Sequence, residues 1–413
     1  MDDTAPSLIS RRRLLTGAAA AAAIPGHASS AAALCNSPLV QKLGRPPYPV
    51  PTLDFVNTPI LEKIAGIRPH RIGGVKLSRA RPIGSGPNRR FLIHNYGHSG
   101  AGITLSFGCA SIAANHVGDI IRELALKPSR VSVAVIGTGV IGLTTADEIK
   151  RRWNDIPLTI YAKDLELTKT CSWVAGGQFE PSGIWRVLDT PLARTEFNTY
   201  LHLSRDRIVK LLKDGTAGDY GIARRRNYTL RWGSDGFDRG VPRDIIACPK
   251  RGPLPFARLK EEGLEYQTWL INPRMLLPQL VRDLNSLGAY RRRLHIARYT
   301  DLIGLTHERI VINCTGFGAG EIMNDLNMVP TRGQIAIFEN PDPARFNYFF
   351  SGGCGDDVTY LFCRQNDIIV GGTWEKGERD PVITQKMAAL LDRAKMIFAG
   401  QTAHCLPPLH RPG

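Results

Sequence analysis

The sequence lacks the cysteine and histidine spacing that a structural metal site needs. Its 8 cysteines are scattered, and none of them forms a Cys-x-x-Cys pair. This absence argues against a zinc site and against a disulfide-dense scaffold. His94 and His98 lie close together, but no third ligand follows at a sensible spacing, so no metal is predicted. Cys314, inside the apolar stretch 311–315, is typical of a buried free thiol.

Long apolar runs are also missing. No stretch approaches the roughly 20 apolar residues of a transmembrane helix, so we expect no membrane span and a soluble mature protein. The formal net charge of +16 raises nucleic acid, an acidic surface or an anionic ligand as partners. The basic residues form no long run with interleaved aromatic residues, however. The clusters 224–226 and 291–293 lie in polar, loop-like surroundings, which favours solvated surface over nucleic-acid binding.

The N-terminal segment carries the pattern of an export signal. Arginines 11–13 precede the short apolar stretch 17–24, and small residues follow up to Ala28. Paired arginines before an Ala-rich segment are typical of a twin-arginine signal. We therefore interpret residues 1–28 as a leader to the periplasm or the exterior, and residues 29–55 as a linker. The protein is cytoplasmic if this leader does not function.

A glycine-rich turn carries the first chemical signal. The apolar strand 131–136 ends in Gly137-Thr138-Gly139-Val140-Ile141-Gly142, a helix is predicted over 143–152, and a second strand over 158–162. In such a βαβ unit the first glycine permits a tight turn, the second lets the backbone approach a pyrophosphate, and the third lets the helix pack on the strand. The helix N-terminus then offers N–H groups to the phosphates. The turn predicts a dinucleotide site at Gly137, Gly139, Val140, Ile141 and Gly142.

Two further segments narrow the type of dinucleotide. Asp164, after the second strand, is a candidate for the ribose hydroxyls, although a plain surface role is equally open. The apolar strand 309–314 ends in Thr315-Gly316, and small residues there let the backbone lie close to a cofactor. This second strand end favours FAD over NAD. A structural glycine turn is the alternative.

The segment 91–105 combines a strand, several glycines and a predicted helix entrance. Gly97, Gly100 and Gly102 leave backbone N–H groups unobstructed there, before a helix expected over 109–126. Such a cluster suits an anion or the electron-rich pyrimidine end of a flavin.

Together these segments resemble the D-amino acid oxidase family. The resemblance covers nearly all of residues 54–413, and the block at 94–98 is its most specific part. The motifs that carry it are His94-Asn95-Tyr96-Gly97-His98, Gly66-Ile67-Arg68-Pro69, Val174-Ala175-Gly176-Gly177 and Arg332-Gly333-Gln334-Ile335. In the family, however, the segments that match residues 66–104 close the chain, whereas here they precede the glycine-rich turn. The order therefore indicates a circular permutation, with residues 127–130 joining the old ends.

The resemblance also assigns roles to particular residues. It implies that Arg68 pairs with a substrate carboxylate and that the hydroxyl of Tyr360 donates to the same carboxylate; read without it, they are a surface arginine and a core aromatic residue. It further implies FAD contacts, beyond the turn, by Gly100, Ala101, Gly102, Ile103, Thr104, Thr170, Ala175, Gly176, Thr315 and Gly316.

The implied reaction is oxidative deamination of a D-amino acid. A hydride leaves the substrate Cα for flavin N5, the imino acid hydrolyses to a 2-oxo acid and ammonia, and O2 reoxidises the flavin to give H2O2. One departure leaves the substrate open: Asp356 stands where the family usually carries a second active-site tyrosine. The alternative is therefore an FAD oxidase or dehydrogenase of another amine or an N-methyl amino acid. A flavin-binding protein without turnover is a third hypothesis.

The predicted fold is α/β in two parts. A Rossmann-like FAD-binding domain with a parallel sheet comprises residues 56–190 and 272–335, of which 56–130 form the permuted segment. A second, α+β substrate domain with a mixed or antiparallel sheet comprises residues 191–271 and 336–413. A homodimer is left open by the sequence.

Overall fold

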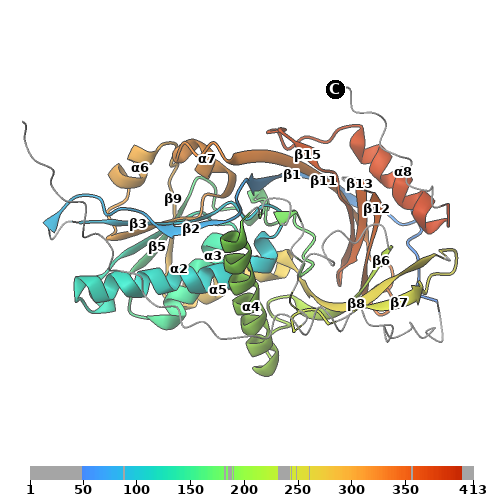
Figure 1. The fold of residues 1–413 in the computed structure, drawn as a ribbon, viewed down its shortest axis with the longest axis horizontal. Helices are drawn as coiled ribbons and strands as arrows, with labels where there is room; N and C mark the ends of the chain where they lie inside the picture. Colours follow the sequence, from blue (N-terminus) through green and yellow to red (C-terminus); the bar gives the residue numbers. More distant parts are fainter. Residues whose placement is uncertain are drawn as a thin grey trace, which may run out of the picture.

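The computed structural model describes residues 49–86, 89–180, 183–184, 188, 190–230, 242, 244–247, 249–259, 261–354 and 357–401. The predicted export signal, most of the predicted linker (residues 29–48) and Asp356 lie outside these residues. The described chain forms two sheets, one in each half of the molecule (Figure 1).

The smaller sheet has six strands, and its central strands are apolar on both faces. Its order is β2 (Lys76–Arg79), β3 (Phe91–Tyr96), β10 (Ile310–Asn313), β4 (Val133–Ile136), β5 (Leu158–Ala162) and β9 (Tyr290–Arg293). All neighbours pair in parallel except β2 and β3. Every residue of β3, β4 and β10 is buried, as expected for parallel strands covered by helices on both faces.

Helices cover this sheet unequally. On one face lie α2 (Gly102–Leu124), α3 (Val140–Arg152) and α5 (Pro273–Ser286), with their apolar side chains in the largest core cluster. On the other face lie the short helices α6 (Tyr299–Gly304) and α7 (Ala319–Ile322), over a smaller cluster. None of the described helices combines the length and the apolar character needed to cross a bilayer.

Helix α2 begins at Gly102, earlier than the predicted start at residue 109. The glycines near its start lie inside the helix, and one of them, Gly108, lets a second helix pack closely against it. A Cβ at Gly108 would lie 1.9 Å from the carbonyl oxygen of Tyr200, and the Gly108 N–H donates to Ser204 Oγ at 2.8 Å. Both partners belong to α4 (Pro191–Lys213), which crosses α2 at this point.

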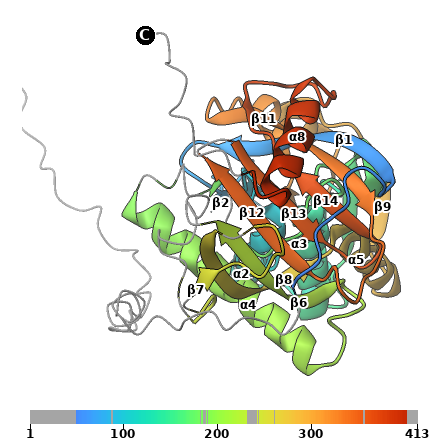
Figure 2. The same cartoon turned by 90° about the vertical axis from the view of Figure 1, so that its right-hand side faces the viewer.

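The larger sheet has nine strands and is mostly antiparallel. Its order is β1 (Ile60–Arg71), β11 (Met328–Glu339), β14 (Asp367–Gly371), β13 (Asp357–Cys363), β12 (Tyr348–Cys354), β6 (Ile222–Leu230), β8 (Glu262–Ile271) and β7 (Lys250–Pro253), with β15 (Glu375–Lys376) on β11. Helix α8 (Lys386–Phe398) packs over one face and closes an apolar core there (Figure 2). A parallel sheet with helices beside a mixed sheet is the predicted fold class, which is thereby confirmed.

The two arginine clusters lie on strands, so the loop-like surroundings predicted for them are wrong. Residues 224–226 are part of β6, and residues 291–293 are part of the edge strand β9. Arg224 and Arg226 are exposed, whereas the flanking Ile222 is buried. Alternating exposure along a strand with one solvated face accounts for a polar run that resembles a loop in sequence.

The described ends of the chain meet in the core under α8. Leu53 belongs to that core, and Phe55 packs against it. The Phe55 and Phe398 ring centroids are 6.1 Å apart. Far from these ends in the sequence, residues 125–132 connect α2 to β4 directly, through the single 3-10 turn Pro128–Arg130.

Candidate cofactor and substrate site

A large cavity lies between the two sheets and is lined by residues of both. It has a volume of about 1110 Å³, just above the roughly 300–1,000 Å³ typical of small-molecule sites. Its wall combines the β4–α3 turn, the ends of β5 and β10, the N-terminus of α2 and the inner face of the nine-stranded sheet. These segments come from distant parts of the chain, and most of the residues predicted to bind a ligand lie on this wall.

The glycine-rich turn forms one end of the cavity. Gly137 has φ +124°, and a Cβ there would lie 2.4 Å from the carbonyl oxygen of Cys314. A Cβ at Gly142 would lie 2.0 Å from the carbonyl oxygen of Gly137, so this third glycine stands behind the wall and lets α3 pack on the turn. Gly139, Val140 and Ile141 line the cavity. The N-terminus of α3 has no side-chain cap from its own N-cap residue and faces this space.

Two strand ends flank the turn. At the end of β10, Thr315 and Gly316 line the cavity, and a Cβ at Gly316 would meet nothing within 4 Å, so the backbone there is open to a ligand. At the end of β5, Asp164 lines the cavity with its side chain 27% exposed. Lys169 and Arg293 approach this carboxylate at 3.6 and 3.7 Å.

The N-terminus of α2 supplies a third part of the wall. Gly100, Gly102 and Ile103 line the cavity. Ala101 and Thr104 do not: Ala101 is buried, and the Thr104 hydroxyl donates to the carbonyl oxygen of Glu180 at 2.8 Å. They hold the helix entrance in place from behind.

The two histidines of the 94–98 block are both buried. His98 lines the cavity, and burial lowers its pKa to about 3, so its ring is neutral near pH 7. Its Nε2 atom has no hydrogen-bond partner among the described residues. His94 does not line the cavity; burial, mainly, lowers its pKa to about 4. The described residues contain no group of three or more His, Cys, Asp or Glu that could hold a metal ion.

The loop 170–177 closes one side of the cavity. Thr170, Ala175 and Gly176, the residues of this loop for which the resemblance implies FAD contacts, all line it. A Cβ at Gly176 would lie 2.5 Å from the ring of Phe362, so the glycine lets the loop contact the nine-stranded sheet. Ser172, which the sequence did not single out, accepts a hydrogen bond from the Val140 N–H at 3.0 Å and so ties this loop to the start of α3.

Arg68 and Tyr360 project from the nine-stranded sheet into the same cavity. The guanidinium of Arg68 donates to the Thr373 carbonyl oxygen at 3.0 Å and lies 5.2 Å from the centroid of the Trp374 ring. A Cβ on residue 333 would lie 2.2 Å from Arg68 Nη1, so Gly333 provides the space for the guanidinium.

The ring of Tyr360 lies flat against backbone. A Cβ at Gly371 or Gly372 would lie 2.3 or 2.2 Å from this ring, and the ring stacks on Phe362 at 4.4 Å between centroids. Burial raises the pKa of Tyr360, and the charge of Arg68 beside it opposes part of that rise. The phenol is therefore a neutral hydrogen-bond donor near pH 7, next to a fixed cation.

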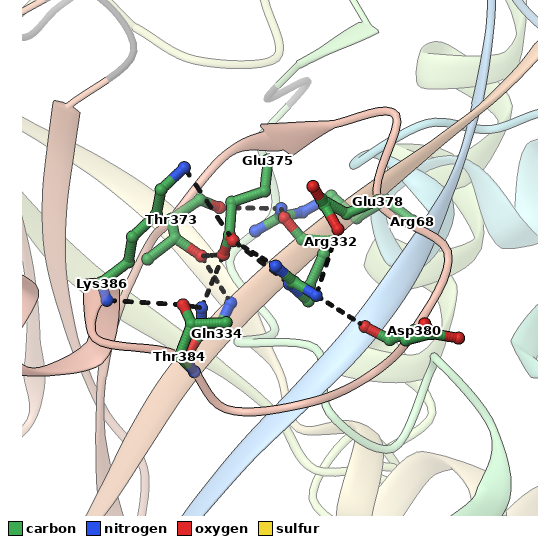
Figure 3. A network of polar contacts seen from close by, with 9 residues as sticks. All are labelled: Arg68, Arg332, Gln334, Thr373, Glu375, Glu378, Asp380, Thr384 and Lys386. Atoms are coloured by element: carbon green, nitrogen blue, oxygen red, sulfur yellow. Dashed lines mark hydrogen bonds and ion pairs between the residues drawn. The ribbon is translucent and has the colours of Figure 1, made fainter.

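A buried polar network stands behind Arg68 (Figure 3). Arg332 pairs with Glu375 at 2.7 Å, and Gln334 and the Thr373 hydroxyl donate to the same carboxylate at 2.6 and 2.9 Å. The Gln334 N–H in turn donates to the Thr373 hydroxyl at 2.8 Å. These bonds fix residue 373, whose carbonyl oxygen holds Arg68. The Arg-Gly-Gln-Ile segment at 332–335 thus positions Arg68, although the Arg332 side chain does not itself line the cavity.

Glu180 is a cavity residue that the sequence did not single out. It follows the Ala175-Gly176-Gly177 loop and lines the cavity wall. Burial raises its pKa to about 7, although a hydrogen bond from Tyr266 opposes part of the rise. The available signal was a lone acidic residue in the apolar stretch Gln178-Phe179-Glu180, which is too weak to identify a site without the fold.

The geometry thus joins a glycine cradle for phosphates, an open backbone at a second strand end and a cation–phenol pair. A family model described as "FAD dependent oxidoreductase" (DAO) matches residues 132–409. The chain belongs to this family. FAD is therefore its cofactor, as predicted, and the protein is an FAD-dependent oxidoreductase. The residues present fit FAD, because Gly137 and Gly142 leave no room for a Cβ at the turn while Gly316 opens toward the cavity.

The chain is also similar to individual proteins. The chain is 28% identical over 280 residues to a D-amino-acid oxidase of Streptomyces coelicolor, covering 66% of this chain and 81% of the relative. It is 26% identical over 275 residues to D-aspartate oxidase 2 of Caenorhabditis briggsae, covering 62% of this chain and 73% of the relative. A crystal structure of glycine oxidase from Geobacillus kaustophilus aligns with a TM-score of 0.48 and 16% identity, over 65% of this chain and 78% of that one.

Proposed function

We propose that this protein oxidatively deaminates D-amino acids. The observation that carries the proposal is the pair formed by Arg68 and Tyr360 in the cavity that also holds the FAD-type glycine turn. A guanidinium suits a carboxylate because it offers two parallel N–H donors, and a neighbouring phenol adds a third. The names of two relatives, a D-amino-acid oxidase and a D-aspartate oxidase, support an amino acid as substrate.

Arg68 and Tyr360 would orient the substrate through its α-carboxylate. The Thr373 carbonyl and the Trp374 ring hold the guanidinium in one place, so little freedom is lost when the carboxylate binds. Tyr360 cannot turn away, because its ring is fixed between Phe362 and the backbone of residues 371–372. A carboxylate fixed at this point leaves the substrate Cα facing the cavity interior, where position and orientation contribute most to the rate.

When bound, the cofactor would supply the redox chemistry, in which the substrate loses a hydride from Cα and a proton from its amine, and O2 is reduced to H2O2 by the same two electrons and two protons. The imino acid then takes up water and releases ammonia, which leaves a 2-oxo acid. The protein need not provide a base for the oxidation if the substrate amine arrives neutral.

Anaerobic reduction of the flavin tests the proposal. Mixing the FAD-loaded protein with a D-amino acid is expected to bleach the flavin, whereas the L-enantiomer is expected to leave it oxidised. Re-admitting air should restore the absorbance and yield one H2O2 for each 2-oxo acid. If only N-methyl amino acids or other amines bleach the flavin, the substrate class is wrong; if air does not restore the colour but an artificial acceptor does, the protein is a dehydrogenase.

We further infer that the chain is a circular permutation of the family order. The family model begins to match at residue 132, next to β4, and leaves β1, β3 and α2 before it. Residues 125–132 join α2 to β4 directly, and the Phe55 and Phe398 ring centroids lie 6.1 Å apart where a link in the usual order would run. Termini that lie close together are the physical condition for permutation.

Restoring the usual order tests this inference. A variant with a short Gly-Ser link from residue 401 to residue 49, opened between 126 and 132, is expected to fold, bind FAD and keep its substrates. As a control, the same closed chain opened within the glycine turn 137–142 should lose FAD. Failure of the first variant to bind FAD while the natural chain does so would contradict the inference.

We also propose that residues 1–28 direct export through a twin-arginine route, as the arginines at 11–13 and the apolar stretch 17–24 suggest. Replacing Arg12 and Arg13 by lysine should retain the protein in the cytoplasm of a bacterium that has this route. Export of the double variant at the natural level would contradict the proposal.

A further inference from the structure

Glu180 is held at the cavity wall by contacts on both sides. Its N–H donates to the Thr104 hydroxyl at 3.1 Å, which fixes its backbone against the first turn of α2. Its carboxylate accepts a hydrogen bond from the Tyr266 hydroxyl at 3.1 Å, and Tyr266 belongs to β8. The first turn of α2 thus fixes the backbone of Glu180, and β8 holds its carboxylate at the cavity wall.

The sheet register separates Glu180 from the Arg68–Tyr360 pair. Tyr266 pairs with Asn227 on β6, which pairs with Phe349 on β12 and so with Phe362 on β13. Tyr266 and Phe362 thus share one row of the sheet, three strand spacings or about 14 Å apart. Arg68 stands beyond them on β1, at the opposite edge from β8 and β7. The cavity therefore has a cation toward one edge of the sheet and a carboxylate toward the other.

Glu180 also differs in its partners from the other carboxylates on the wall. Asp164 lies close to Lys169 and Arg293, and Glu321 pairs with Arg379 at 3.3 Å. Among the described residues, no cation pairs with Glu180, whose recorded side-chain partner is the neutral Tyr266. A half-buried carboxylate that lacks a cation carries a desolvation cost, and a cationic ligand group would relieve that cost.

We propose that Glu180 selects D-amino acids whose side chain ends in a cationic group, an amine or a guanidine. The proposal rests on the proposed function and narrows its substrate class. Arg68 takes the α-carboxylate and Glu180 takes the side-chain cation, so a substrate with both charges spans the cavity. An apolar side chain would cover the carboxylate without pairing with it, which disfavours such substrates.

The pairing depends on pH through Glu180 itself. Because burial raises its pKa to about 7, the carboxylate is protonated below that pH and ionised above it. Tyr266 on β8 is the titratable group that contacts it, and burial keeps the pKa of that phenol well above its usual value, so it stays neutral. Thr104 on α2 is uncharged. Preference for a cationic side chain should therefore increase as pH rises through about 7.

D-Lysine and D-norleucine provide the matched pair for the test, because they share a linear side chain and differ in the terminal amine. The rate of anaerobic flavin reduction in the FAD-loaded protein is compared for the two amino acids at equal low concentrations. The pH is 8.5 to 9, about 1.5 to 2 units above the Glu180 pKa, so that the carboxylate is ionised. We expect D-lysine to be preferred. In Glu180→Gln, which keeps an acceptor for Tyr266, the lysine-to-norleucine ratio should fall by about 10- to 100-fold.

Two further variants sharpen the result. Glu321→Gln removes the same charge from a carboxylate that already has a cationic partner, and it should leave the ratio within a few-fold of the natural protein. Tyr266→Phe keeps the carboxylate but removes the hydrogen bond that lowers its pKa, so the rise in preference should move to higher pH. Flavin content and the thermal midpoint confirm that each variant is folded.

The outcomes separate the two proposals. If no D-amino acid reduces the flavin, the proposed function fails and this inference fails with it. If D-amino acids reduce the flavin but D-norleucine matches D-lysine at high pH, the function holds and the inference is overturned. An unchanged ratio in a folded, FAD-loaded Glu180→Gln variant overturns it as well.

Discussion

The two ends of the cavity differ in what forms them: mainly backbone at one end and side chains at the other. The FAD end consists mainly of backbone: the turn at 137–142, the open strand end at Gly316 and the N-terminus of α2. The end that we propose binds the substrate consists of side chains, Arg68 and Tyr360, which a buried network and a pair of glycines hold in place. The first end excludes side chains so that a cofactor can approach, and the second positions charges.

This difference affects how each end tolerates change. The glycine turn fails when a Cβ is added at Gly137 or Gly142, whatever its chemistry, because other backbone atoms occupy the space. A side-chain end fails gradually, because shape, charge and hydrogen bonding can be removed one at a time. The following predictions test that contrast, from the largest expected effect to the smallest.

Gly142→Ala should abolish FAD binding. The new Cβ would lie 2.0 Å from the Gly137 carbonyl oxygen, so α3 could not pack on the turn without moving. We expect a loss of several kcal/mol in unfolding free energy, at or beyond the upper end of the roughly 1–3 kcal/mol typical of overpacking, and no bound flavin in the absorbance spectrum. Gly218→Ala is the control, since a Cβ there meets nothing within 4 Å. Normal flavin content in Gly142→Ala would show that backbone crowding does not define this end.

Glu375→Ala should destabilise the substrate end by about 3 kcal/mol, because Arg332 loses its buried carboxylate partner and keeps only the exposed carboxylate of Glu378 at 3.4 Å. Arg332→Met combined with Glu375→Leu should recover much of the loss. Burial by itself would raise the Glu375 pKa, but hydrogen bonds from Arg332, Gln334 and Thr373 lower it below its ordinary 4.5. Its contribution is therefore complete above that pH and is lost as pH falls through the folded-state value. Urea unfolding of both variants across this range checks the sign; a deficit that grew in acid would contradict it.

Arg68→Lys should keep FAD but lose activity. The lysine retains the charge and loses the planar fork, so kcat/KM with a D-amino acid should fall by roughly 30-fold or more. Stopped-flow reduction of the flavin measures the effect, and flavin content should equal that of the natural protein. The exposed Arg81→Ala is the control for net charge. Parallel loss of flavin and activity in Arg68→Lys would mean that the two ends are not separable.

Tyr360→Phe should have the smallest effect of the four. Stacking on Phe362 and packing on residues 371–372 are retained, and only the hydroxyl is removed. A hydrogen bond to a charged group contributes about 1.5–3 kcal/mol, and we expect the lower end because Arg68 remains, so kcat/KM should fall by about 10-fold, with normal stability. A larger effect than that of Arg68→Lys would reverse the proposed order of importance at this end.

Local sequence predicted the FAD end well. The strands at 133–136, 158–162 and 310–313 follow from short apolar runs, and the glycine spacing predicts the turn between the first of them and α3. This is possible because one continuous segment contains the strand, the turn and the helix. Where sequence reasoning failed, a distant contact decided: Gly108 precedes a helix by pattern, but it lies inside α2 because α4 packs against it.

The substrate end was less accessible from sequence. Arg68 and Tyr360 were identified through a resemblance, and nothing local to either residue indicates that they share a cavity. Glu180 and Ser172 were missed because each depends on a partner elsewhere in the chain. Tyr266, the partner of Glu180, lies far from it in sequence, and Ser172 bonds to the start of α3, which belongs to another motif. Asp356, which leaves the substrate open, lies outside the described residues.

The sequence by itself determined that the chain binds a dinucleotide, because the spacing of Gly137, Gly139 and Gly142 fixes a backbone shape that needs no distant partner. The tertiary structure decided which charges meet beside that cofactor. Arg68 and Glu180 line the same cavity although they are far apart in the chain. Arg68 lies on β1, at one edge of the nine-stranded sheet, and hydrogen bonds to Thr104 of α2 and Tyr266 of β8 hold Glu180 toward the other edge. Sheet register and helix packing are properties of the whole fold, and they set the arrangement of charge from which we infer the substrate.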